Sequence, residues 1–156
     1  MITIRKATVN DATRLEELYA ELEEDAVMYQ PQHFVMSGEG ARSQFIKDML
    51  NLDNQTIFVA VCDGEVVGFA HAVLIKAKAI SCLKPETSLY LQDLVVTNSL
   101  RSKGIGSMLM YAVKEYGRNN NADFFRTQVF PQNTDGLRFY KRIGFKETMI
   151  TIECDL

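Results

Sequence analysis

A strand, a turn with two glycines, a helix and a second strand follow one another in the second half of the chain. This order restricts the fold more than any other feature. Residues 87–96 are rich in apolar and β-branched side chains, which predicts a strand. Apolar residues recur at helical spacing over residues 105–119, and residues 124–130 predict the next strand. Because a helical crossover joins parallel strands, these two strands are expected to lie parallel in one sheet.

The first half of the chain predicts a hairpin and two helices. Two β-rich runs meet at Asp63-Gly64, a dipeptide typical of tight hairpin turns. The other expected elements are a strand at 2–6, helices at 12–26 and 41–50, a short helix that Asn133 caps and Gly144 ends, and a last strand at 145–155. The acidic face of the first helix is expected to be solvated. The order β-α-α-β-β-β-α-β-α-β indicates a mixed α/β fold of α+β character, with helices on both faces of the sheet.

Length, charge and cysteine content limit the class of protein. A chain of 156 residues suits a single domain over residues 1–156. A net charge of -3 argues against nucleic acid as a partner. No apolar run approaches the roughly 18 residues of a membrane span, and the N-terminus lacks a signal-peptide core, so a cytoplasmic location is expected. Cys62, Cys82 and Cys154 are widely spaced and fit free thiols. Without a cysteine/histidine cluster, no metal is expected.

The turn RSKGIG, residues 101–106, has the properties of an anion site. The start of the following helix leaves backbone N–H groups unpaired at the positive end of the helix dipole. Gly104 and Gly106 let an anion approach the backbone, and Arg101 and Lys103 add positive charge, which favours phosphate. Nucleotide motifs do not fit, because no lysine–hydroxyl pair follows Gly106 and the third glycine of GxGxxG is absent. A plain strand-to-helix connection remains the alternative.

Two segments resemble motifs of the GCN5-related N-acetyltransferases. RSKGIG resembles the family's Q/R-x-x-G-x-G/A motif, and NTDGLRFYKRIGF, residues 133–145, resembles N-x-x-A-x-x-F-Y-x-x-x-G-F. The preceding YLQDLVV looks like the fourth strand of that family. Gly136 departs from the usual alanine, which would cost about 1 kcal/mol of helix propensity. The resemblance implies a single N-acetyltransferase domain of the GNAT type with a central sheet of six to seven strands.

The resemblance also implies acetyl-CoA as the co-substrate. Its pyrophosphate would lie on the 101–107 turn, and its pantetheine arm would bind the unpaired backbone of the strand at 87–96, with Asn133 and Tyr140 on the thiol side. The residues expected to hold it are Leu94, Val95, Val96, Arg101, Ser102, Lys103, Gly104, Ile105, Gly106, Ser107, Asn133, Gly136 and Tyr140.

Acetyl transfer to an amine needs a base, and Asp93 is the first candidate. An alkylammonium with a pKa near that of lysine, about 10.4, must lose a proton before it attacks the thioester. Asp93 lies in an otherwise apolar strand and would act through water; His71 is the rival base. The alternative for each is a structural role. Strict alternation places Asp93 on one face with Leu91 and Val95, unless a bulge intervenes.

Two further groups complete the expected chemistry. The Leu94 N–H would donate to the thioester oxygen, where one donor is worth roughly 3–4 kcal/mol. Tyr140, at the position of the family's tyrosine, would act as the acid toward the leaving thiolate. The alternative for Tyr140 is a packed helix residue. No covalent acyl-enzyme is required.

The loops at residues 27–39 and 76–86 are expected to shape the acceptor site. In the first loop, Tyr29, His33 and Phe34 lie close in sequence to carboxylates, which favours a small cationic amine. A protein N-terminus or lysine is the alternative acceptor, and a non-catalytic acyl-CoA-binding module or a nucleotide-binding protein is the alternative function. Exposed strand edges permit a homodimer, but no particular residue indicates one.

Overall fold

The strands form one mixed sheet in which their order in space is their order in the sequence. The computed structural model describes residues 1–156. Its strands are β1 Ile2–Lys6, β2 Gln55–Cys62, β3 Glu65–Lys76, β4 Thr87–Val96 and β5 Phe124–Thr127. β1 to β4 pair as antiparallel neighbours, whereas β4 and β5 pair in parallel. The parallel crossover predicted from the sequence is therefore confirmed.

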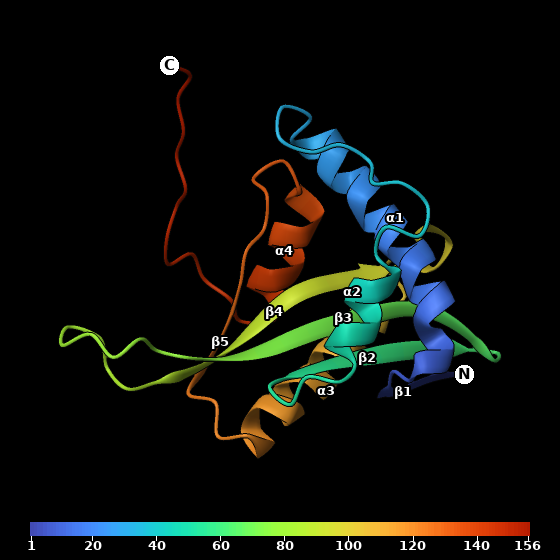
Figure 1. The fold of residues 1–156 in the computed structure, drawn as a ribbon, viewed down its shortest axis with the longest axis horizontal. Helices are drawn as coiled ribbons and strands as arrows, with labels where there is room; N and C mark the ends of the chain where they lie inside the picture. Colours follow the sequence, from blue (N-terminus) through green and yellow to red (C-terminus); the bar gives the residue numbers. More distant parts are fainter.

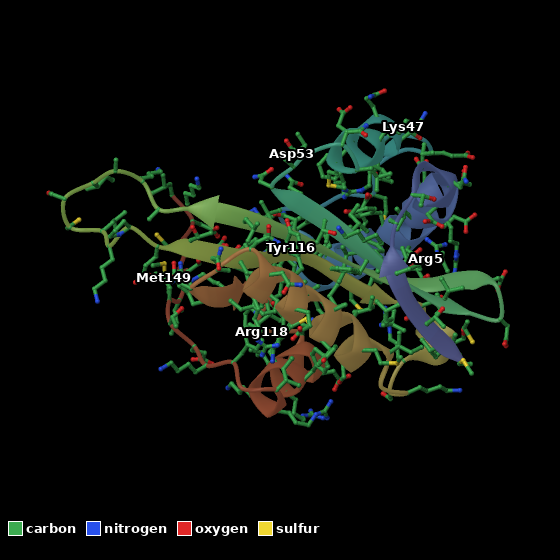
Figure 2. All side chains as sticks on the ribbon, turned by 90° about the horizontal axis from the view of Figure 1, so that it is seen from below. Arg5, Lys47, Asp53, Tyr116, Arg118 and Met149 are labelled. Atoms are coloured by element: carbon green, nitrogen blue, oxygen red, sulfur yellow. The ribbon has the colours of Figure 1, made fainter.

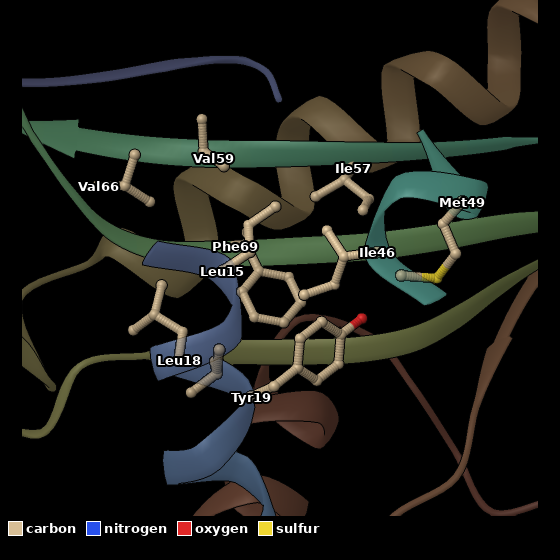
Figure 3. Close-up of a cluster of buried hydrophobic side chains, with 10 residues drawn as sticks. Leu15, Leu18, Tyr19, Ile46, Met49, Ile57, Val59, Val66 and Phe69 are labelled. Carbon is tan, nitrogen blue, oxygen red and sulfur yellow. The ribbon is translucent and has the colours of Figure 1, made fainter. Parts of the chain in front are cut away.

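Helices cover both faces of this sheet, as the element order predicts. They are α1 Ala12–Tyr29, α2 Ser43–Met49, α3 Ile105–Asn119 and α4 Thr134–Arg142. In Figure 1, α1 and α2 lie over one face and α3 lies behind the strands. Each face has its own hydrophobic cluster. Figure 3 shows the first, in which Leu15 and Tyr19 of α1 and Ile46 of α2 pack on Phe69 of β3. The second cluster joins α3 and side chains of α4 to the opposite face.

The hairpin between β2 and β3 has the turn predicted from the sequence. Asp63 and Gly64 have φ angles of 50° and 83°. Positive φ at both central residues matches the right-handed twist of the strands and is the reason for the Asp-Gly preference.

The expectation of a solvated acidic face on α1 is wrong at several positions. Glu16 accepts a hydrogen bond from the Ser43 hydroxyl at 2.8 Å. Glu21 accepts from Thr97 Oγ1 at 3.0 Å, and Glu23 is bound by Ser37 and Arg42. These carboxylates fasten α1 to α2 and to the end of β4. Helical periodicity showed which face of α1 is polar, but not that other segments cover part of it.

The sheet has five strands, so the expected six to seven is an overcount. The expected strand at 124–130 ends at Thr127, and the expected last strand is not part of the sheet. Residues 146–156 form no backbone–backbone hydrogen bond. In Figure 1 this segment runs from α4 to the C-terminus apart from the five strands. Strand propensity alone does not make a strand, because the ladder needs a partner.

Candidate active site

The sheet opens between β4 and β5, and the opening exposes one edge of β4. β5 pairs only with Ser88 to Leu91 of β4. Beyond Leu91 the strand pairs with β3 alone. The Thr97 N–H donates to Val67 O of β3 at 2.8 Å, so alternation directs the N–H groups of Leu94 and Val96 to the open edge. The residues expected to meet the pantetheine arm thus lie where backbone donors are free.

A β-bulge at this opening changes the face on which Asp93 lies. Asp93 pairs with His71, whereas Leu91 pairs with Ala72, so Gln92 is the additional residue. Leu91 packs in the cluster of α3, and Asp93 lies on the face of α1. The strict alternation that placed Leu91 and Asp93 together is therefore wrong.

Asp93 is held in a small polar network inside the apolar layer under α1. Its Oδ2 accepts a hydrogen bond from the Tyr19 hydroxyl at 3.0 Å and lies 3.4 Å from His71 Nδ1. The other ring nitrogen of His71 lies 2.8 Å from Gln55 Oε1. His71 is only 2% exposed, whereas the Asp93 side chain is 17% exposed. No protein donor reaches Asp93 Oδ1, so this oxygen is available to a substrate or to water.

The turn at residues 101–107 lies directly after the open half of β4. Ser102 and Gly104 have φ angles of 63° and 83°, and Gly104 is the N-cap of α3. No side chain caps this helix, so the N–H groups of its first turn have no protein partner from a capping side chain. A Cβ added to Gly104 would meet no atom within 4 Å, so the approach to these donors is clear.

The two basic residues of the turn have different roles. Arg101 Nε donates to Val96 O at 3.0 Å, and its Nη2 lies 3.3 Å from Asp25 Oδ2. Arg101 therefore ties the turn to β4 and α1. Lys103 is exposed and forms no ion pair, so its charge is available to an anion on the turn.

Tyr140 of α4 packs against the cluster on the α3 face of the sheet and lies close to Thr127, the last residue of β5 that pairs with β4. Its ring packs edge-on against Phe139 and Phe145, with centroids 5.3 Å and 5.5 Å away. Burial, with a further contribution from the negative charge of Asp93, raises the pKa of Tyr140 to about 12. The phenol therefore keeps its proton throughout the neutral range.

Asn133 and Gly136 form the start of α4. Asn133 Oδ1 accepts a hydrogen bond from the Gly136 N–H at 2.9 Å, which confirms the predicted cap. A Cβ on Gly136 would lie 2.5 Å from Asn133 Nδ2. The departure from the family's alanine thus has a packing consequence: here an alanine would displace the capping side chain.

The three residues expected at the acceptor site contact two different partners. α1 continues to Tyr29, so the loop begins later than expected. Tyr29 and Phe34 both pack on Phe130, with centroids 6.2 Å and 5.5 Å away. Burial, followed by the charge of Asp25, raises the pKa of Tyr29. His33 instead lies 2.8 Å from Glu153.

Several residues at the site were not identified from the sequence. Tyr19 belongs to the apolar stripe of α1, and only the fold shows that its hydroxyl reaches Asp93. Gln55 begins β2 and contacts His71. The Tyr90 hydroxyl donates to Gln128 at 3.1 Å, and burial together with the charge of Asp93 raises its pKa. No local pattern marks these contacts, because each joins segments distant in the sequence.

No three histidine, cysteine, aspartate or glutamate side chains lie close enough together to hold a metal ion. None of the helices combines the length and the apolar character needed to cross a bilayer.

Solved structures share this fold over nearly the whole chain. A mutant of the BH1408 protein from Bacillus halodurans superimposes with a TM-score of 0.94 at 22% identity, covering 99% of both chains. The aminoglycoside N-acetyltransferase AAC(6')-Iy in complex with CoA gives a TM-score of 0.77 at 22% identity, covering 100% of this chain and 95% of that one. At these identities the likeness concerns the fold.

Sequence comparison identifies the family. Aminoglycoside N(6')-acetyltransferase type 1 of Salmonella typhimurium is 28% identical over 102 residues, which cover 65% of this chain and 70% of that protein. The profile of the Acetyltransferase (GNAT) family matches residues 15–145, most of the chain. The motifs, the opened sheet and this match agree, and the chain belongs to the GNAT family of acetyltransferases.

Proposed function

We propose that this protein transfers the acetyl group of acetyl-CoA to a primary amine by direct attack of the amine on the thioester. The observation that carries the proposal is the open edge of β4, which leads directly into the uncapped start of α3. This edge supplies a row of free backbone donors followed by an anion site, and Asp93 and Tyr140 approach it from opposite faces. An elongated ligand that ends in a phosphate fits this order of groups.

The residues present fit acetyl-CoA, which provides the activated acetyl group. The N–H groups of Val96 and Leu94 would bind the pantetheine amide and the acetyl carbonyl. The first-turn N–H groups of α3 would hold the pyrophosphate, with Lys103 as the nearby cation. Arg101 holds the turn in place by hydrogen bonds to Val96 O and Asp25.

Asp93 is the proposed base. Tyr19 and His71 occupy the side of Oδ2 and leave Oδ1 to take a proton from the ammonium group, directly or through water. His71 is nearly inaccessible and lies between Asp93 and Gln55. Because His71 is enclosed in this way, we assign it a positioning role and not that of the general base.

Tyr140 is the proposed donor to the leaving thiolate. Its pKa of about 12 lies above the roughly 8.5 of a free thiol, so complete proton transfer would be uphill. The phenol therefore acts chiefly as a fixed hydrogen-bond donor to the developing negative charge. Leu94 N–H plays the same part for the carbonyl oxygen.

The proposed acceptor is a small cationic amine. Tyr29 and Phe34 pack on Phe130, three residues after the end of β5, and Tyr90 is close enough to Asp93 for that charge to raise its pKa. Aromatic rings together with the Asp93 carboxylate are a combination that suits an alkylammonium group. The name of the Salmonella relative, which acts on aminoglycosides, supports the same class.

Calorimetric titration with acetyl-CoA, CoA and ATP tests the donor site, and thiol release with an amine panel tests the acceptor. We expect micromolar binding of acetyl-CoA, no response to ATP, and thiol release with an aminoglycoside or a polyamine. Release only with a lysine or N-terminal peptide would indicate a protein acetyltransferase. Binding without release for any amine would indicate an acyl-CoA-binding module, and absence of CoA binding would overturn the proposal.

A further inference from the structure

His71 lies between two acceptor groups at unequal distances. Its Nε2 is 2.8 Å from Gln55 Oε1, whereas its Nδ1 is 3.4 Å from Asp93 Oδ2. The residue is only 2% exposed, so bulk water does not replace either partner. The positions of the ring protons are therefore set by these two side chains.

The two contact lengths show which ring nitrogen carries the proton. A neutral imidazole has one N–H donor and one lone pair, and neither an amide oxygen nor an ionised carboxylate can donate. The 2.8 Å contact has the length of an N–H···O hydrogen bond, so Nε2 donates to Gln55. A donor that faces a carboxylate forms a bond of about 2.7–2.9 Å. The 3.4 Å from Nδ1 to Asp93 is longer, as expected where a lone pair faces an acceptor.

The opposite orientation of the Gln55 amide does not fit these distances. Its NH₂ group would donate to Nε2, and the ring proton would then be on Nδ1. That proton would point at the Asp93 carboxylate, and a charge-assisted bond would bring the two groups to about 2.9 Å or less. The separation of 3.4 Å is too long for such a bond. The amide oxygen is therefore the atom that faces the ring.

The sheet holds Gln55 in place for this contact. In the register of β2 and β3, Ile57 is the residue opposite His71, and Gln55 precedes Ile57 by two positions. Side chains two residues apart in a strand point to the same face, so Gln55 is directed toward the ring. In Figure 2, Lys47 of α2 and Arg118 of α3 lie on opposite sides of the sheet. Ile57 packs in the cluster of α1 and α2, so these helices cover the contact.

We propose that Gln55 is a positioning residue that acts on Asp93 through His71: its amide oxygen keeps the proton on Nε2, so that the neutral ring turns a lone pair toward the carboxylate. The inference rests on the proposed function in taking Asp93 as the base. A carboxylate that accepts fewer hydrogen bonds is the better proton acceptor. Uptake of a proton at Oδ1 also removes the unfavourable contact between the Nδ1 lone pair and the negative charge.

Tyr19 is the donor that remains on Asp93 Oδ2. Burial, followed by the charge of Asp93, raises the pKa of Tyr19, so this hydroxyl keeps its proton. Three further charged or titratable side chains lie close to Tyr19 or Asp93, namely Arg42, Tyr90 and Tyr140. None of the three forms a hydrogen bond with the ring of His71. The ring protons therefore respond to Gln55 and Asp93.

Nitrogen-15 NMR of the imidazole rings tests the proton position in the free protein, without acetyl-CoA or an amine. The chain has two histidines, so His33→Gln leaves only the signals of His71. At an alkaline pH at which the ring is neutral, we expect the proton on Nε2 in the unchanged protein and in Gln55→Glu, which keeps an acceptor oxygen. In Gln55→Leu the proton should move to Nδ1, where Asp93 accepts it. A proton on Nδ1 in the unchanged protein, or the same proton position in Gln55→Leu, would overturn the proposal.

Turnover tests the consequence for the reaction. Gln55→Leu should lower kcat roughly three- to tenfold at alkaline pH, because the neutral ring then donates to Asp93, and should leave the KM for acetyl-CoA unchanged. At acidic pH, where the ring carries both protons in either protein, the difference should disappear. Gln44→Leu is the matched control, because Gln44 is exposed on α2 and contacts Asp48.

The pH dependence separates positioning from a structural role. A loss of kcat in Gln55→Leu that is the same at every pH, or an equal loss in Gln44→Leu, would mean that Gln55 is only structural and would overturn the proposal. If the unchanged protein acetylates no amine but shows the expected proton positions, the proposed function fails, whereas control of the His71 proton by Gln55 stands.

Discussion

The two halves of β4 are built from similar residues but have different roles. From Thr87 to Leu91 the strand lies between β3 and β5, and Leu89 and Leu91 are each only 2% exposed. From Gln92 to Val96 the strand keeps β3 but loses β5. The first half contributes to the core, and the second presents backbone donors, a carboxylate and the path to the anion site.

The change from one half to the other occurs within about one residue. Leu91 is the last residue of β4 paired with β5, and Gln92 is the bulge. The bulge turns Asp93 toward α1, where Tyr19 and His71 hold it. The opening supplies unpaired donors on one edge, while β4 keeps its pairing with β3 on both sides of the bulge.

Asp93→Asn should have the largest effect on the open half. The amide cannot accept a proton, so turnover should fall by about 10²–10³, within the range typical of a lost general base. Acetyl-CoA affinity, measured by calorimetry, should change little. The matched control is Asp123→Asn, because Asp123 accepts a hydrogen bond from the Thr87 N–H at 2.7 Å at the start of the paired half.

The two aspartates separate chemistry from structure. We expect Asp123→Asn to leave turnover within about twofold. Equal losses of turnover in both variants would mean that Asp93 stabilises the folded structure and is not the base. A normal rate and pH profile for Asp93→Asn would remove it as the base.

Gly104→Val tests the end of the open half. At a φ of 83° a β-branched side chain is strained, and its Cβ would occupy the clear approach to the α3 N–H groups. We expect acetyl-CoA binding to weaken about 10- to 100-fold. Gly64→Val is an unusually close control, because Gly64 has the same φ of 83° and equally open space in the β2–β3 hairpin.

Strain is common to both glycine variants, so both should lower the melting temperature. Only Gly104→Val should affect the calorimetric titration. Unchanged affinity in Gly104→Val, or equal loss in Gly64→Val, would contradict the assignment of the turn.

The contrast between the halves of β4 also shows where sequence reasoning succeeds. Local signals were sufficient for the Asp63-Gly64 hairpin and the Asn133 cap, because their hydrogen bonds join residues close in sequence. The crossover helix predicted the parallel strands correctly. The face of Asp93 was missed, because no residue type marks a bulge at Gln92.

Contacts between distant segments account for the remaining errors. The strand count was too high, because residues 146–156 have strand composition but no partner within the chain. Tyr19 and Gln55 looked like ordinary helix and strand residues. Their contacts with Asp93 and His71 depend on the packing of α1 on the sheet and on the pairing of β2 with β3.

Tyr140→Phe should have a moderate effect, about tenfold on turnover, because one hydrogen bond to the leaving group is lost. With a pKa of about 12, Tyr140 stays protonated up to pH 10. The ratio of the turnover rate of the unchanged protein to that of Tyr140→Phe should therefore be constant from pH 7 to 10. A ratio that falls toward pH 10 would show that the phenol ionises there. Tyr116→Phe is the control: its buried hydroxyl on α3 has no partner, so its loss should leave turnover and stability unchanged or slightly improved.

Thr127→Val should have the smallest effect and tests the point at which the strands separate. Thr127 Oγ1 donates to Leu91 O at 3.0 Å, at the last pair of β4 and β5. Valine keeps the shape of the side chain but removes this bond, so unfolding free energy should fall by about 1 kcal/mol in a denaturant titration. The Thr127 hydroxyl also opposes the effect of burial on the Tyr140 pKa, so that pKa should rise further in Thr127→Val.

Ser88→Ala is the control variant, because it removes a hydroxyl that donates to Ile75 O at 3.3 Å in the paired half. If the pair of Leu91 and Thr127 fixes the point at which β4 and β5 separate, only Thr127→Val should change the KM for acetyl-CoA. An equal change in both variants would mean that another part of β4 fixes this point.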